Sequence, residues 1–131
     1  MALDVDKELK IFWIIGLIVL LIYGLWLFIS AESYEAIFGV AGYFDPIAAR
    51  IVGAIFIAWL IIMIRLYKGL DNWEKIEEWV LFSVIGNILM IIAQTICIIM
   101  YNLLSAGTII AMIVNLFFVI VGIHIIIQKR K

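Results

Sequence analysis

The sequence has one cysteine, one proline and few charges, since Asp, Glu, Lys and Arg together make up 15% of its 131 residues. The lone Cys97 excludes an intrachain disulfide and a CxxC redox pair, and its isoleucine neighbours predict a small buried side chain. A pI near 5.7 and the lack of a basic block before the last three residues argue against a nucleic-acid partner. These absences exclude a disulfide scaffold, a thiol oxidoreductase and a nucleic-acid-binding protein.

Apolar side chains dominate what is present. The residue types AVILMFWYC make up 68% of the chain and the mean hydropathy is +1.28, whereas soluble domains contain about 45–50% apolar residues. A soluble protein of this size has no interior large enough to bury so many apolar side chains. The composition therefore predicts that the lipid bilayer is the solvent for most of the chain, which excludes a soluble enzyme.

Four apolar stretches are long enough to cross a bilayer, which takes roughly 20 helical residues. They cover residues 11–30, 46–64, 79–100 and 108–127. Runs such as IIGLIVLLI are apolar on every side and lack the alternation of a β-barrel strand. The acidic start of the chain differs from the basic start of a cleaved signal peptide, so we expect the first stretch to be retained. The sequence predicts an all-α protein: a single-domain integral membrane four-helix antiparallel bundle over residues 1–131.

The loops predict the orientation of the bundle. Every Lys and Arg except Arg50 lies near a terminus or between the second and third stretches. The positive-inside rule then places both termini in the cytoplasm. Aromatic residues near both boundaries are expected to be interfacial anchors, the inner ones being Trp13, Tyr67, Trp73 and Trp79 and the outer ones Trp26, Tyr34, Tyr43 and Tyr101.

The connections predict further local structure. Tyr34 and Phe38 share one face of the outer loop, which indicates a short interfacial helix followed by a glycine-containing turn. Asp45 before Pro46 is typical of a helix start. The third helix is expected to begin in the cytoplasm, with a capping box that starts at Asp71. The seven residues YNLLSAG leave room only for a tight hairpin between the third and fourth helices.

Polar residues within the third and fourth stretches form stripes. Ser83, Asn87 and Gln94 fall on one face of the third helix, and Asn115 shares a face of the fourth with Gly122. Gln94 and Asn115 are equally far from the hairpin, so we expect their amides to bond each other. Two interpretations remain open: the stripe links helices, or it lines a pocket for a ligand.

The first two stretches carry small residues, including Gly24 and Gly53, whose spacing predicts close contact between these helices. The Tyr23 hydroxyl lies within a stretch and needs a hydrogen-bond partner or a ligand. Arg50 has nearby carboxylates as counterions, namely Glu32, Glu35 and Asp45. It is also suited to an anionic lipid or substrate group. The candidate ligand-pocket residues are Tyr23, Arg50, Asn87, Gln94 and Asn115.

No arrangement of residues predicts catalysis. None of the four stretches contains a carboxylate, which disfavours proton-driven transport. No serine has a histidine at a comparable depth, and His124 is the only histidine, so we expect no catalytic, cofactor or metal site. An enzyme is disfavoured, although the sequence does not decide this point.

The segment FISAESYEAIFGVAGYFDPIAARIVGAIFIAW resembles small four-span membrane proteins of the DoxX-like and DUF4345 type, through its outer amphipathic stretch and the opening Arg50, Gly53, Ala54 of the second span. The resemblance covers the first half of the chain. It implies a four-helix membrane bundle without a firmly assigned activity, and some relatives are subunits of membrane oxidoreductases. Some other four-span bundles bind or isomerise sterols, but this chain lacks the acidic residues of the isomerases.

We therefore expect an accessory or subunit protein without its own catalytic site, acting through helix contacts with a membrane protein partner or with further copies of itself. The alternative is a small module that binds an apolar molecule, namely a lipid, isoprenoid or quinone, between its helices. The two hypotheses differ in whether the polar stripe faces a cavity or is used up in bonds between helices.

Overall fold

The computed structural model describes residues 4–38 and 45–131, and every regular element in this part of the chain is a helix. The elements are α1 (Val5–Ile29), α2 (Ala31–Phe38), α3 (Pro46–Leu66), the 3₁₀ turn η1 (Tyr67–Gly69), α4 (Trp73–Tyr101) and α5 (Ala106–Lys129). The predicted helical class is confirmed for the described residues.

Four of these helices, α1, α3, α4 and α5, are long and apolar enough to cross a membrane. They coincide with the four predicted stretches, and α4 starts at Trp73, before its apolar part, as expected. The first helix likewise begins earlier than the apolar stretch, at Val5, so that Asp6 and Glu8 belong to its first turn. Polar ends on apolar helices thus extend two of the predicted spans.

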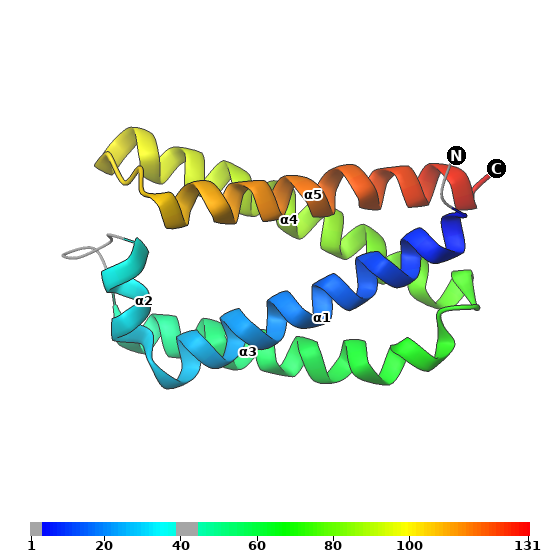
Figure 1. Ribbon diagram of the computed structural model, residues 1–131, viewed down its shortest axis with the longest axis horizontal. Coiled ribbons are helices and arrows are strands. Elements are labelled where there is room, and N and C mark those ends of the chain that lie inside the picture. The colour runs from blue at the N-terminus through cyan, green and yellow to red at the C-terminus, as the bar shows by residue number, and fades with distance from the viewer. Residues whose placement is uncertain (1–3, 39–44) are drawn as a thin grey trace. The chain divides into compact units, whose positions relative to one another are not determined.

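The described residues form two compact units, one of residues 4–12 and 68–131 and the other of residues 13–38 and 45–67. Helix α1 contributes to both. In the first unit α4 and α5 lie side by side along most of their length (Figure 1). Asn102 ends α4 in the left-handed conformation, with φ 54°, which asparagine tolerates better than most residues. Ser105 then caps α5 by accepting a hydrogen bond from the Thr108 backbone, and the predicted tight hairpin is confirmed.

The second unit is built on a close approach of α1 and α3. A Cβ atom at Gly53 would lie 2.6 Å from the backbone nitrogen of Phe28 and 2.9 Å from the carbonyl oxygen of Gly24, so only glycine fits there. The predicted contact between the first two long helices is confirmed. Farther along the same pair, the Trp13 indole donates a hydrogen bond of 3.0 Å to the carbonyl of Met63.

The link between α1 and α3 agrees with the sequence in most of its described part. Helix α2 follows α1 after a single residue, Ser30, and is the predicted short helix. The Asp45 carboxylate accepts a hydrogen bond of 2.8 Å from the Ile47 backbone, with Pro46 in the first turn of α3, as predicted. The expected glycine-containing turn and Tyr43 lie outside the described residues.

Three local predictions are wrong. Asn72, one residue after Asp71, is the N-cap of α4, and its side chain makes no capping hydrogen bond. Trp13 is 1% exposed and bonded to a backbone carbonyl, so it is a packing residue, not an interfacial anchor. Cys97 is exposed on α4, because it lies on a side of the helix that no other part of the described chain covers.

Candidate functional site

The amides of Gln94 and Asn115 bond each other across the α4–α5 hairpin. Asn115, which is buried, donates from Nδ2 to Oε1 of Gln94 at 3.0 Å. The pairing follows from the equal distance of both residues from the hairpin and from their position on facing helix sides. This prediction is confirmed, and the amide pair joins α4 to α5.

Asn87 is the second buried amide, and it bonds within its own helix. Its Nδ2 donates to the carbonyl oxygen of Ser83 at 2.7 Å and lies 3.4 Å from the Ser83 hydroxyl. Among the described residues, no buried side-chain nitrogen or oxygen lacks a hydrogen-bond partner. Each of the three amide side chains, Asn87, Gln94 and Asn115, therefore takes part in at least one hydrogen bond within or between α4 and α5.

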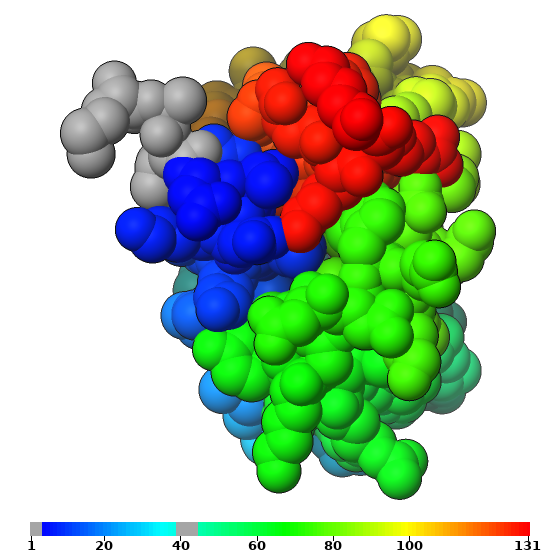
Figure 2. Space-filling model, turned by 90° about the vertical axis from the view of Figure 1, so that its right-hand side faces the viewer, coloured from blue at the N-terminus to red at the C-terminus, as the bar shows by residue number. Residues whose placement is uncertain are grey.

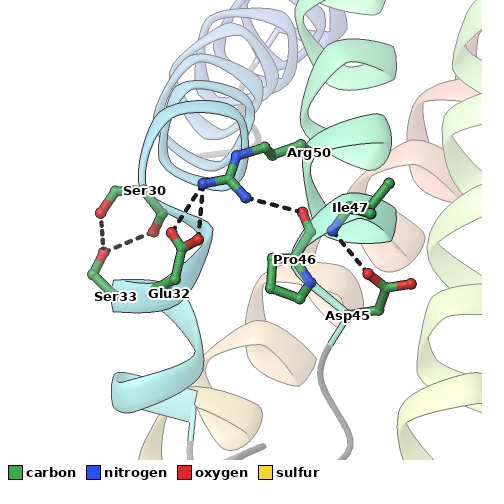
Figure 3. A network of polar contacts seen from close by, with 7 residues as sticks. All are labelled: Ser30, Glu32, Ser33, Asp45, Pro46, Ile47 and Arg50. Carbon is green, nitrogen blue, oxygen red and sulfur yellow. Dashed lines mark hydrogen bonds and ion pairs between the residues drawn. The ribbon is translucent and has the colours of Figure 1, made fainter.

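Arg50 lies on the first turns of α3 and pairs with Glu32 of α2 (Figure 3). Its Nη2 donates to both carboxylate oxygens, at 2.8 and 3.1 Å, while Nη1 reaches the Pro46 carbonyl at 3.5 Å. The pKa of Glu32 is lowered, first by a hydrogen bond from its own backbone N–H and then by the Arg50 guanidinium. Of the expected counterions Glu32 takes this role, while Asp45 caps α3.

Tyr23 belongs to an aromatic cluster at the junction of α1 and α2, made of Tyr23, Trp26, Tyr34 and Phe38. The Tyr23 ring centroid lies 6.3–6.4 Å from those of the other three rings, and Tyr34 stacks on Phe38 at 4.1 Å. Burial raises the pKa of Tyr34 to about 12, with a smaller contribution from Tyr23. The cluster anchors α2 against the end of α1 by ring packing.

The candidate pocket residues thus fall into two groups. Tyr23 and Arg50 belong to the unit of α2 and α3, and each contacts a neighbour in that unit. The amides of Asn87, Gln94 and Asn115 belong to the α4–α5 unit, where they bond Ser83 or each other. Four of the five residues make a hydrogen bond within their own unit, whereas the contacts of Tyr23 are with the rings of its aromatic cluster.

Sequence reasoning missed a cluster of charges at the ends of α1, α4 and α5. His124 Nδ1 lies 2.8 Å from the Glu8 carboxylate, Lys129 pairs with Asp6, and Arg130 pairs with Glu77 of α4. Figure 2 shows the start of α1, in blue, beside the C-terminal residues, in red. The acidic residues near the N-terminus and the basic residues at the C-terminus were the signal in the sequence from which this pairing could have been predicted. The Gln128 amide, one turn further along α5, lies 3.3 Å from the other ring nitrogen of His124.

The chain matches no protein-family model, and neither a curated protein nor a solved structure is significantly similar to it. Within residues 4–38 and 45–131, no three His, Cys, Asp or Glu side chains are grouped so that they could hold a metal ion.

Proposed function

We propose that this protein is a multi-pass membrane protein whose four long helices form an antiparallel bundle with both termini in the cytoplasm. The length and hydropathy of α1, α3, α4 and α5 support insertion, since all four meet the requirement of a membrane span. Large isoleucine and leucine side chains are exposed along all four helices, as expected where the solvent is lipid. The distribution of Lys and Arg among the loops supports the orientation.

Within the membrane, the protein acts as an accessory or subunit protein that binds a partner through its helices and has no catalytic site of its own. The observation that carries this proposal is the use of the polar stripe: Asn87, Gln94 and Asn115 are bonded within the α4–α5 hairpin. A polar side chain at membrane depth is costly unless paired, so these bonds favour a structural role. What the helices offer outward is apolar surface, which either lipid or a partner helix can cover.

The alternative, a module that binds an apolar molecule in a pocket of Tyr23, Arg50, Asn87, Gln94 and Asn115, requires a ligand to replace existing bonds. The Gln94–Asn115 pair and the Arg50–Glu32 pair would both have to open. The resemblance to DoxX-like and DUF4345-type proteins, some of which are subunits of membrane oxidoreductases, agrees better with the accessory role.

Gentle purification from the native membrane, followed by native mass spectrometry, tests the two hypotheses. We expect a second membrane protein, or further copies of this chain, at fixed stoichiometry and without a small molecule whose retention depends on the Gln94–Asn115 pair. The double variant Gln94→Leu, Asn115→Leu removes both amides of the pair and should leave that complex intact. A small molecule that is retained at equal stoichiometry and lost in the double variant would contradict the accessory role.

Labelling with a membrane-impermeant maleimide tests the orientation. Cys97 is first replaced by alanine, and single cysteines are then placed in α2 as Glu35→Cys and in the α3–α4 link as Lys68→Cys, both at polar positions outside the apolar stretches. We expect Glu35→Cys to react in intact cells and Lys68→Cys only after permeabilisation. The reverse pattern would show that the termini are outside.

A further inference from the structure

A groove lies between the start of α1 and the second half of α5, within one unit of the protein. Its volume is about 260 Å³, and it is lined by Glu8, Ile11, Phe117, Ile120, Val121 and His124. Four of these side chains are apolar, and the two polar ones are the members of the His124–Glu8 pair. The groove is thus apolar along its length, with a titratable pair as its polar part.

The polar pair is held in place and partly reachable. Glu8 Oε2 lies 2.8 Å from His124 Nδ1, and Gln128 holds the other ring nitrogen at 3.3 Å. The Glu8 side chain is 18% exposed and that of His124 is 49% exposed, so a small molecule can contact the imidazole and the edge of the carboxylate. Glu8 precedes the first apolar stretch by less than one turn, which sets the pair at the boundary between head groups and acyl chains.

The chemistry of the pair selects the head group of a ligand. A carboxylate accepts hydrogen bonds and repels anions, which disfavours a fatty acid or a phosphate ester beside Glu8. A neutral hydroxyl can donate to the Glu8 carboxylate, which accepts more than one hydrogen bond, while the two imidazole nitrogens keep their contacts with Glu8 and Gln128. The apolar side chains from Ile11 to Phe117 suit a hydrocarbon chain attached to such a head.

The size of the groove limits how much of a ligand it can enclose. Its volume corresponds to about nine water-sized groups, at roughly 30 Å³ each, which is below the 300–1,000 Å³ of pockets that enclose a whole ligand. It is bounded by six side chains, whereas a protein partner contacts about 20–30 residues a side. We propose that this groove binds the hydroxyl head and the first carbons of a single-chain neutral lipid, an isoprenoid or long-chain alcohol, whose remaining chain lies in the bilayer.

Photolabelling in phosphatidylcholine vesicles tests this site. The full-length protein is exposed to a photoactivatable hexadecanol and, separately, to the hexadecanoic acid that carries the same reactive group, and the labelled peptides are mapped. We expect hexadecanol to label the α1 start and residues 117–124, to be displaced by unlabelled hexadecanol, and to exceed the acid at least threefold there. Equal labelling by the two probes, or labelling that unlabelled hexadecanol does not displace, would overturn the proposal.

Two variants of α5 provide a matched comparison. Ile120→Trp fills the groove, while Ile113→Trp places the same side chain seven residues earlier on the same helix face, at a similar exposure of 61% against 65%. We expect Ile120→Trp to reduce hexadecanol labelling at least fivefold and Ile113→Trp to leave it unchanged. Equal effects of the two variants would mean that the probe reports general lipid contact, which would overturn the site.

A variant of the polar pair tests the selection of the head group. Glu8→Gln keeps a carbonyl oxygen that accepts a hydrogen bond but removes the negative charge. We expect this variant to retain hexadecanol labelling and to raise labelling by the acid to the level of the alcohol. If the preference for the alcohol persists in Glu8→Gln, the carboxylate does not select the head group and this part of the proposal is wrong.

Discussion

Replacing Gly53 by alanine should force α1 and α3 apart. The added Cβ would lie 2.6 Å from the Phe28 backbone nitrogen, about 0.8 Å inside the ordinary contact range that begins at 3.4 Å. The nearest atoms are backbone atoms of α1, including the Gly24 carbonyl, so no side-chain rotation can relieve the clash. Overpacking of this kind costs about 1–3 kcal/mol.

Gly86 on α4 is the matched control, because a Cβ there would meet nothing within 4 Å. Both substitutions gain the same helix propensity, about 0.8–1 kcal/mol, which cancels when the variants are compared. We therefore expect Gly86→Ala to be at least as stable as the native protein and Gly53→Ala to be less stable than Gly86→Ala by about 1–3 kcal/mol.

Reversible unfolding in mixed micelles of dodecyl maltoside and SDS, followed by circular dichroism, measures the difference in the free energy of unfolding. Equal stability of the two variants would refute the reasoning, because it would mean that α1 and α3 do not approach each other closely at Gly53. Gly24→Ala, whose Cβ would lie 3.2 Å from a flexible Ile57 side chain atom, should fall between them.

Three further outcomes follow from the contacts. In a Cys97→Ala background, removal of either amide by Gln94→Leu or Asn115→Leu should cost roughly 0.6–2 kcal/mol, and the double variant should cost less than the sum of the two, as measured by unfolding in micelles. Asp45→Ala, which removes a capping hydrogen bond, should cost about 0.5–2 kcal/mol of stability in the same assay. Asn72, the N-cap of α4, makes no capping hydrogen bond through its side chain, so a similar loss of stability in Asn72→Ala would contradict a role for the Asp45 cap. Ultraviolet absorbance should show the Tyr34 phenol still un-ionised at pH 11, since its folded pKa of about 12 lies above the ordinary 10.0. Because the folded state holds this proton more tightly than the unfolded state, the resulting stability is present below pH 10 and is lost as the pH rises towards 12. A titration component near pH 10 that disappears in Tyr34→Phe would show that the ring is not buried.

The sequence predicted the helices and two contacts between them, the approach of α1 to α3 at Gly53 and the Gln94–Asn115 pair. The apolar runs predicted the four long helices because a continuous apolar length is a local property of the chain. The Gln94–Asn115 pair was also predictable, since a short hairpin fixes the depth of residues at equal distances from its turn. Asp45 before Pro46 marked the start of α3 for the same local reason.

Only the tertiary structure decided which partner each polar side chain bonds. Asn87 looked like a pocket residue, but its amide reaches back to the preceding turn, a choice of rotamer that periodicity does not specify. Trp13 was expected at the interface, yet its indole bonds the Met63 carbonyl, because the packing of α1 against α3 determines which aromatic residues are covered. The His124–Glu8 pair joins residues 116 positions apart, and no local pattern contains such a contact. The sequence by itself determined the helices and their order, since these depend on composition and short-range spacing. Partners of charged and polar side chains depend on how the helices pack, and that is what the tertiary structure supplied.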